Sequence, residues 1–270
     1  MQGVKNSSLV KRHLVAAVIL PVFIAYVYYL PPSPYFLALL AVVAVSAMWE
    51  FFVMYKAPAK LYVPGLVLGA VLFYIFCEQP AYSLNAVLIS LFFLLLLRLF
   101  FVSTPSGCMS DIGPLGIGIL YIAGFLSFQW MIRKEALGLE YIFLLYFSVW
   151  LADSMALYIG TYLGRHKLYP AISPNKTVEG AFGSVLGGVL GASIAKAVFG
   201  IQVLSTAGVI LTGSALGTAA LIGDLIESML KRDAGVKDSS RLIPGHGGVL
   251  DKLDGMLIAG PVLYLIVRWF

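Results

Sequence analysis

Long apolar segments separated by short polar ones follow one another along the whole 270-residue chain. Each holds roughly 20 residues, the length that a helix needs to cross the hydrocarbon core of a bilayer. The segments are continuously apolar rather than alternating, which excludes the strands of a transmembrane barrel. The pattern therefore predicts an all-α, polytopic integral membrane protein with about nine spans. The predicted spans are Leu14–Leu30, Tyr35–Tyr55, Leu61–Cys77, Leu84–Val102, Gly113–Ile132, Leu139–Tyr162, Val178–Phe199, Val203–Leu230 and Val249–Phe270.

Composition supports a membrane protein without a soluble domain. Apolar residues make up 60% of the chain and charged residues 11%, against about 25% charged residues in soluble domains. The first apolar segment follows a basic stretch, as in a signal peptide, but it contains Pro21 and lacks a small-residue cleavage site. We therefore expect an uncleaved first helix.

The distribution of Lys and Arg predicts the orientation. With the N-terminus inside, the cytoplasmic side receives 14 of the 18 basic residues, and the outer side receives Arg133, Lys134, Lys196 and Arg268. Cytoplasmic loops carry such an excess, so we expect an N-in, C-out protein. The polar loops 164–177 and 231–248 then face the cytoplasm. The net charge of +5 reflects this loop bias, and no nucleic-acid partner is expected.

The chain changes character near residue 150. Residues 1–150 are aromatic and aliphatic, whereas residues 151–270 are rich in glycines and alanines spaced to let membrane helices approach closely. We expect a scaffold and lipid-access region in the first part and a catalytic region in the second. Cys77 and Cys108 are expected to be free thiols on opposite membrane faces.

The stretch from Ser228 to Asp254 is the longest polar run, and the main candidate metal ligands lie within it or one turn before it. Asp224 and Glu227 lie three residues apart on one predicted helix face, and Asp251 and Asp254 repeat that spacing. Carboxylates converging beside lipid need cations, and hard oxygen ligands suit magnesium. Simple ion pairs with neighbouring lysines and arginines are the alternative.

Two further segments resemble anion-binding sites. Pro244 to Gly248, with His246 at its centre, can present backbone N–H groups to phosphate at the start of the last helix, unless it is an ordinary loop. Ser173-Pro174 predicts a helix start, which places Asn175, Lys176 and Thr177 at a helix N-terminus.

Three charged residues interrupt other apolar segments. Asp153 is a functional candidate because an intramembrane carboxylate is costly to bury. Glu50 and Arg98 could pair with each other or extend to the membrane surface, and neither is assigned to the site. Together these features predict a metal–phosphate site open to the cytoplasm, suited to phosphoryl or nucleotidyl transfer.

The C-terminal third resembles a known family. Ser228-x-Leu230-Lys231-Arg232, Lys237-Asp238 and Pro244-x-His246-Gly247-Gly248-Val249-x-Asp251-Lys252-Leu253-Asp254 are similar to the signature of phosphatidate cytidylyltransferases, also called CDP-diacylglycerol synthases. One position departs, because Lys252 stands where the family pattern has arginine. Lysine keeps the charge but loses bidentate phosphate recognition.

The resemblance implies a reaction in which CTP and phosphatidate give CDP-diacylglycerol and pyrophosphate, with Mg²⁺ as the cofactor. A second metal or a monovalent cation at the same site is left open. It implies a homodimer in a bacterial-type inner membrane, multi-pass, with the active site facing the cytoplasm. It assigns metal ligation first to Asp224 and Asp251, then to Asp254, Glu227 and Asp153. The residues expected to act in catalysis or bind substrate are Asn175, Lys176, Thr177, Asp224, Lys231, Arg232, Lys237, Asp238, Arg241, His246, Gly247, Gly248, Asp251 and Lys252.

Two other functions stay open at this point. A CTP-dependent polyprenol or lipid kinase would use similar parts but attack the γ-phosphorus. A cation-coupled transporter would place its carboxylates near the membrane midplane on broken helices, whereas here they gather at one edge beside a polar loop.

Overall fold

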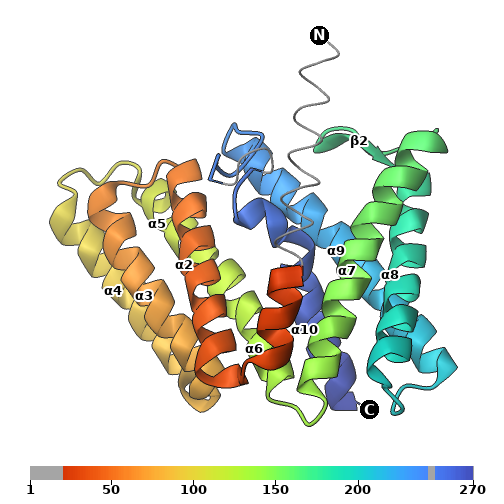
Figure 1. Cartoon of the computed structure of the whole chain (residues 1–270). Coiled ribbons are helices and arrows are strands. Elements are labelled where there is room, and N and C mark those ends of the chain that lie inside the picture. The colour runs from red at the N-terminus through yellow and green to blue at the C-terminus, as the bar shows by residue number, and fades with distance from the viewer. Residues whose placement is uncertain (1–20, 243–246, 270) are drawn as a thin grey trace.

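The computed structural model describes residues 21–242 and 247–269, and it is a bundle of long helices (Figure 1). Residues 21–29 are helical and precede the numbered elements. The elements are η1 Pro32–Phe36, α2 Leu37–Met54, α3 Ala59–Glu78, η2 Pro80–Tyr82, α4 Ser83–Phe101, α5 Cys108–Gly118, η3 Ile119–Gly124, α6 Phe125–Arg133, α7 Gly138–Tyr162, β1 Lys167–Tyr169, β2 Ser173–Thr177, α8 Val178–Phe199, α9 Thr206–Asp233, η4 Leu250–Lys252 and α10 Asp254–Trp269.

The all-α membrane fold is confirmed. Seven described helical segments are long and apolar enough to cross a membrane: Pro32–Met54, Ala59–Glu78, Pro80–Phe101, Cys108–Arg133, Gly138–Tyr162, Val178–Phe199 and Thr206–Asp233. They match seven of the nine predicted spans within a few residues. Of the other two predicted spans, the first begins outside the described residues, and the last is represented by α10, which has 16 residues.

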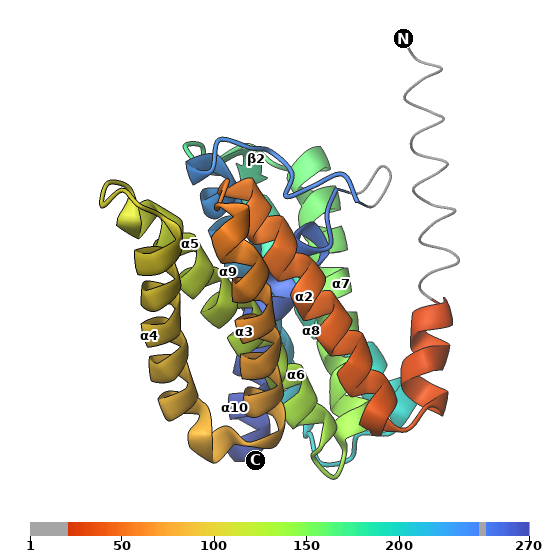
Figure 2. The ribbon, with the colours of Figure 1, turned by 90° about the vertical axis from the view of Figure 1, so that its left-hand side faces the viewer.

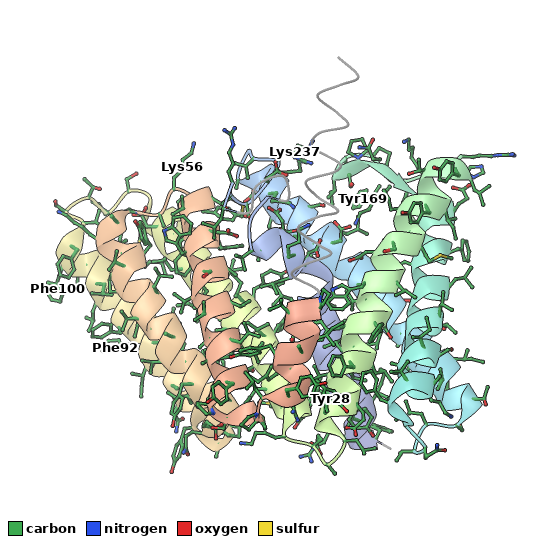
Figure 3. All side chains as sticks on the ribbon, viewed as in Figure 1. Tyr28, Lys56, Phe92, Phe100, Tyr169 and Lys237 are labelled. Carbon is green, nitrogen blue, oxygen red and sulfur yellow. The ribbon has the colours of Figure 1, made fainter. Side chains whose placement is uncertain are left out.

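Apolar side chains cover the outside of the bundle, as expected where lipid replaces water. Phe92 and Phe100 on α4 are 61% and 76% exposed and point away from the other helices (Figure 3). Figure 2 shows α4 at the edge of the bundle, beyond α3. Within the described part of the chain, Cys77 and Cys108 are both free thiols, as predicted.

Glycines allow the helices α7, α8 and α9 to pack backbone against backbone. A Cβ atom at Gly183 would lie 2.8 Å from the carbonyl oxygen of Met155 on α7. On the other face of α8, a Cβ at Gly217 of α9 would lie 3.0 Å from the Cα of Val185. The small residues of the C-terminal half therefore bring three chain segments together, which is the close approach that their spacing predicted.

The loops bearing the polar candidates gather at one end of the bundle. The β1–β2 hairpin and the loop between α9 and η4 both lie there (Figure 1). Lys56, Tyr169 and Lys237 are at this same end (Figure 3). The residue-150 boundary expected between the two regions falls inside α7, so one continuous helix belongs to both.

Candidate active site

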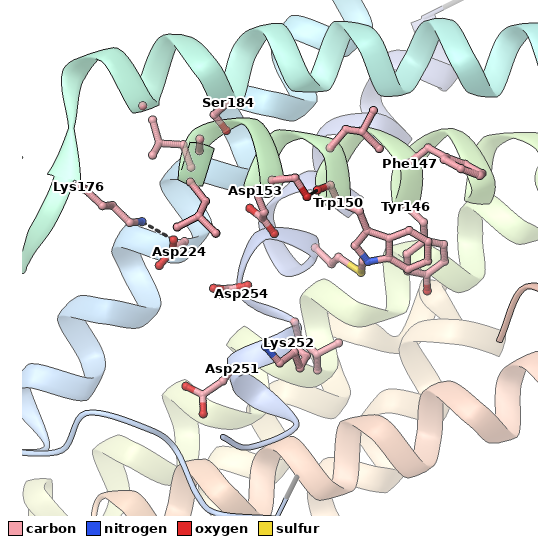
Figure 4. Close-up of a pocket in the computed structure, with 18 of the residues that line it drawn as sticks. Tyr146, Phe147, Trp150, Asp153, Lys176, Ser184, Asp224, Asp251, Lys252 and Asp254 are labelled. Carbon is pink, nitrogen blue, oxygen red and sulfur yellow. Dashed lines mark hydrogen bonds and ion pairs between the residues drawn. The ribbon is translucent and has the colours of Figure 1, made fainter. Parts of the chain in front are cut away.

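A cavity of about 1220 Å³ opens among the helix 21–29, α2, α7, α8, α9 and α10. Its lining has two different ends (Figure 4). Asp153, Asp224 and Asp254 occupy one end, and the rings of Tyr146 and Trp150 occupy the other. A single space therefore joins a charged surface to an apolar one.

Each carboxylate at the charged end comes from a different helix. Asp153 lies on α7, Asp224 on α9 and Asp254 at the first position of α10. The loop after α9 returns the chain so that the start of α10 meets the C-terminal half of α9. A Cβ at Gly223 would touch the backbone of Asp254, so this glycine allows the two helices to meet beside the cavity.

Lys176 supplies a positive charge at the same place. Its Nζ lies 2.5 Å from Asp224 Oδ2 and its side chain is 17% exposed (Figure 4). The second cavity-lining lysine is Lys252. Four carboxylates (Asp153, Asp224, Asp251 and Asp254) line the cavity against these two lysines, which leaves negative charge in excess.

The predicted helix start at Ser173-Pro174 is wrong. Residues Ser173–Thr177 form strand β2, which pairs antiparallel with β1, Lys167 opposite Thr177 and Tyr169 opposite Ser173. The helix begins only at Val178, because the Thr177 hydroxyl accepts the Gly180 N–H at 3.1 Å and so caps it. Asn175 and Lys176 therefore line the cavity from an extended strand and not from a helix N-terminus.

Asp251 is held by four donors of its own chain. Lys231 Nζ lies 2.7 Å from Oδ1, while Oδ2 accepts from Gly248 N at 2.7 Å, Ser239 N at 3.0 Å and Ser239 Oγ at 2.9 Å. Burial would raise the pKa of this carboxyl, but Lys231 and the N–H donors outweigh it, and the net pKa shift is downward. Asp251 is thus an ionised carboxylate whose orientation is fixed by the loop around it.

Glu227 is close to this network but outside the cavity lining. It is 1% exposed, its Oε2 lies 3.0 Å from Lys231 Nζ, and its Oε1 has no hydrogen-bond partner among the described residues. Lys231 therefore sits between Glu227 and Asp251 and is only 11% exposed. The lysine that the sequence assigned to phosphate is engaged here with two carboxylates.

Other predicted site residues lie away from the cavity. Arg232 bonds the carbonyl oxygens of Ile172 at 3.3 Å and Val236 at 3.0 Å, which ties the end of α9 to the hairpin. Lys237, Asp238 and Arg241 are exposed and are not part of the cavity lining. His246 lies outside the described residues.

The glycine pair Gly247-Gly248 serves close packing in this structure. Gly247 has φ +88°, and a Cβ there would lie 2.5 Å from Asp251 Oδ2. A Cβ at Gly248 would lie 2.6 Å from Glu50 Cδ. The N–H of Gly248 points to Asp251, so it binds a protein carboxylate where the sequence predicted a substrate phosphate.

Sequence reasoning missed Glu50. It does not pair with Arg98, which instead bonds Asp111 at 2.7 Å. Glu50 is completely buried on α2. It accepts hydrogen bonds from the N–H groups of Val249 and Leu250, which belong to the segment from Ser228 to Asp254, hereafter the signature segment. The available signal was a glutamate inside an apolar helix, which needs donors to be tolerated there.

The donor set at the charged end fits a hard divalent cation. Carboxylate oxygens are the ligands that magnesium prefers, and the excess negative charge calls for a cation before any anionic substrate can enter. Among the described residues, no three His, Cys, Asp or Glu side chains form a ready-made metal cluster. Magnesium sites that act on phosphates often use only one or two carboxylates, with water and substrate oxygens completing the shell.

The apolar end is built from aromatic rings. Tyr146 and Trp150 stack at 5.4 Å between centroids, and Phe23 meets the Tyr146 ring edge-on at 5.0 Å. Tyr146 donates to Gln129 Oε1 at 2.6 Å, which satisfies its hydroxyl inside the bundle. This end offers an apolar surface for hydrocarbon chains in the same cavity as the carboxylates and lysines.

A comparison with known proteins decides the family. The model of a family described as the cytidylyltransferase family matches residues 10–270. The chain belongs to the cytidylyltransferase family. Of the residues that carried the resemblance in this family member, Val249 and Asp251 to Asp254 line the cavity.

Curated relatives of this cytidylyltransferase-family chain share one name. A phosphatidate cytidylyltransferase of Bacillus subtilis is 35% identical over 215 residues, covering 77% of this chain and 79% of the relative. One from Thermotoga maritima is 32% identical over 211 residues, 77% of each chain. One from Staphylococcus epidermidis is 37% identical over 160 residues, so the match spans 58% of that relative's length.

Proposed function

We propose that the chain transfers the cytidylyl group of CTP to phosphatidate, giving CDP-diacylglycerol and pyrophosphate. The observation that carries the proposal is the two-ended cavity, with Lys176 and Asp224 at one end and Trp150 at the other. A nucleotide and a lipid headgroup suit the charged end, and the acyl chains suit the aromatic end. The family and the shared name of the relatives support the same reaction.

In this reaction an oxygen of the lipid phosphate attacks the α-phosphorus of CTP. The new P–O bond forms as the bond from the α-phosphorus to the bridging oxygen breaks, and pyrophosphate leaves with the electron pair. Phosphatidate is already ionised near neutral pH, so a dedicated general base is unnecessary. The protein has to position two anions and offset their repulsion, and Lys176 and Lys252 lie where they can do so.

Magnesium is part of the proposal, and a second metal or a monovalent cation is compatible with the surplus of carboxylates. Asp224 and Asp254 would hold the ion, with Asp153 beside them and Asp251 next in the lining. The bound cation supplies charge neutralisation for the phosphates. Glu227 lies outside the lining, so its oxygens are the least suited of the predicted ligands.

We also propose that the charged end faces the cytoplasm of a bacterial inner membrane. The basic loops favour this orientation, and CTP is found on that side. A homodimer remains part of the proposal on the basis of the family resemblance. The glycine faces do not add support, since they pack α7, α8 and α9 against one another within the chain.

The test uses purified protein in detergent with phosphatidate, Mg²⁺ and CTP labelled separately at the α- and γ-phosphates. We expect α-label in the lipid and γ-label in pyrophosphate. We also expect the Asp224→Asn variant to lose activity, while Asp233→Asn, on the same helix but exposed at its end, keeps it. Transfer of γ-label to lipid would show that the protein is a kinase. Transfer of neither label would refute the proposal that it is an enzyme of this kind.

A further inference from the structure

A carboxylate in the N-terminal half makes four hydrogen bonds to the signature segment. Glu50 Oε1 accepts from Ser240 Oγ at 2.7 Å and from Val249 N at 2.9 Å. Glu50 Oε2 accepts from Ser239 Oγ at 3.0 Å and from Leu250 N at 2.8 Å. These four donors are separated from Glu50 by 189 to 200 residues along the chain.

The surroundings make these bonds necessary. Glu50 is 0% exposed, and no lysine or arginine pairs with it among the described residues. A buried carboxylate without a cation has to be stabilised by N–H and O–H donors, and four donors match its accepting capacity. The backbone N–H groups of residues 249 and 250 are therefore engaged by Glu50 and are closed to a substrate phosphate.

The hydrogen bonds of Glu50, which together form a clamp on the signature segment, connect through Ser239 to Asp251, one of the carboxylates that line the cavity. The Ser239 hydroxyl lies 3.0 Å from Glu50 Oε2 and 2.9 Å from Asp251 Oδ2, so its single proton is shared between two acceptors. Gly248 is enclosed by the same groups, since a Cβ there would collide with both Ser239 and Glu50. Ser240, by contrast, contacts Glu50 but makes no hydrogen bond to Asp251.

A second contact from the same helix holds the start of the signature segment. Tyr55, the C-cap residue of α2, donates to the carbonyl oxygen of Leu230 on α9 at 3.1 Å. Thus α2 bonds the end of α9 through Tyr55 and the turn before α10 through Glu50. The loop between them, which returns the chain to the cavity, is fixed at both ends by one helix.

We infer that Glu50 is a positioning residue for the active site: it clamps Ser239, Ser240, Val249 and Leu250 through their hydroxyl and N–H groups and thereby sets the orientation of Asp251 at the cavity. The expected effect of Glu50 on catalysis rests on the proposed cytidylyl transfer, whereas its hydrogen bonds to the signature segment are independent of that proposal. Glu50 touches no substrate, so it acts through Ser239 and Asp251.

The first test measures the clamp without turnover. Backbone amide hydrogen exchange of residues 239–252 is compared in the wild type, Glu50→Gln and Glu78→Gln, where Glu78 pairs with the half-exposed Lys134. In Glu50→Gln the amide NH₂ faces two donors, so we expect exchange in this segment to rise at least roughly tenfold. Glu78→Gln should leave it unchanged. Unchanged exchange in Glu50→Gln would overturn the clamp, whatever the reaction proves to be.

The second test measures transfer of α-label from CTP into lipid. We expect kcat to fall roughly tenfold or more in Glu50→Gln, with the KM for CTP changed less, and to recover in part in Glu50→Asp. Ser239→Ala should lower kcat clearly more than Ser240→Ala, because only Ser239 links Glu50 to Asp251. Equal effects of the two serine variants would contradict the link.

A double-mutant cycle separates positioning from general destabilisation. If Glu50 acts through Asp251, Glu50→Gln adds little to the loss already caused by Asp251→Asn. Fully additive losses would overturn the inference. Folding is checked with a thiol-reactive dye in a Cys108→Ser background, since Cys108 is partly exposed whereas Cys77 is 3% exposed and is expected to react only on unfolding. If Glu50→Gln does not fold, the Ser239 and Ser240 pair still decides the question.

Discussion

Replacing Gly217 with alanine should separate α8, which follows the strand that carries Lys176, from α9, which carries Asp224. Gly217 lies on α9, two turns before Asp224, and its backbone faces Ser184 and Val185 of α8. A Cβ there would stand 3.0 Å from the carbonyl carbon of Ser184 and 3.0 Å from the Cα of Val185. Carbon atoms pack at about 3.5–4.0 Å, so the helices have to move apart by about 0.5–1 Å.

Two effects follow from that displacement. Overpacking of this kind costs about 1–3 kcal/mol of folding free energy, since both neighbours are backbone and cannot rotate away. The displacement also disturbs the ion pair between Lys176 and Asp224, because Lys176 lies two residues before the start of α8 and Asp224 is part of α9. A misplacement of about 1 Å at a site lowers turnover by up to about a hundredfold, so we expect a loss between tenfold and a hundredfold.

The assay is α-label transfer at saturating CTP and phosphatidate, with unfolding followed by dye reaction at Cys77. Gly116→Ala is the matched control, because Gly116 lies within helix α5 and a Cβ there would meet nothing within 4 Å. We expect this control to keep wild-type turnover and unfolding temperature. A Gly217→Ala protein with wild-type turnover would refute the claim that close α8–α9 packing sets the site.

Three further predictions concern the cavity. Lys176→Met should lower kcat/KM for CTP roughly a hundredfold, because it removes a phosphate clamp and leaves Asp224 without its partner, and steady-state kinetics with Lys176→Arg as the comparison checks this. Exhaustive chelation should abolish transfer and excess Mg²⁺ should restore it; activity that survives chelation would contradict the metal site. Trp150→Ala should raise the KM for phosphatidate several-fold and leave that for CTP unchanged, whereas Trp269→Ala, 89% exposed, should change neither.

The helices could be predicted well because burial in lipid imposes a simple rule. Seven predicted spans agree with the structure, since any apolar run of this length has to satisfy its backbone internally. The shared environment of Asp153, Asp224 and Asp254 was also foreseeable, because carboxylates within apolar helices have to face a polar interior. Family resemblance pointed to the same residues independently.

The misses share a physical cause, which is hydrogen bonding to partners that lie outside each short motif. Ser173-Pro174 has the local pattern of a helix start, but pairing with Lys167–Tyr169 holds the segment extended until the Thr177 cap. Gly247-Gly248 has the local pattern of an anion site, but the Gly248 N–H donates to Asp251 and the following N–H, that of Val249, donates to Glu50.

The clamp at Glu50 also imposes an order on assembly. The donors at Val249 and Leu250 are synthesised 199 and 200 residues after Glu50. At about 5–20 residues per second, the carboxylate waits roughly 10–40 seconds for them after it leaves the ribosome. Glu50 lies in the last two turns of α2, near the end of the span, where water can solvate it during that time. The active site can therefore be completed only at the end of synthesis, when the residues just before the last helix are made and their N–H groups can bond to Glu50 in the first half of the chain.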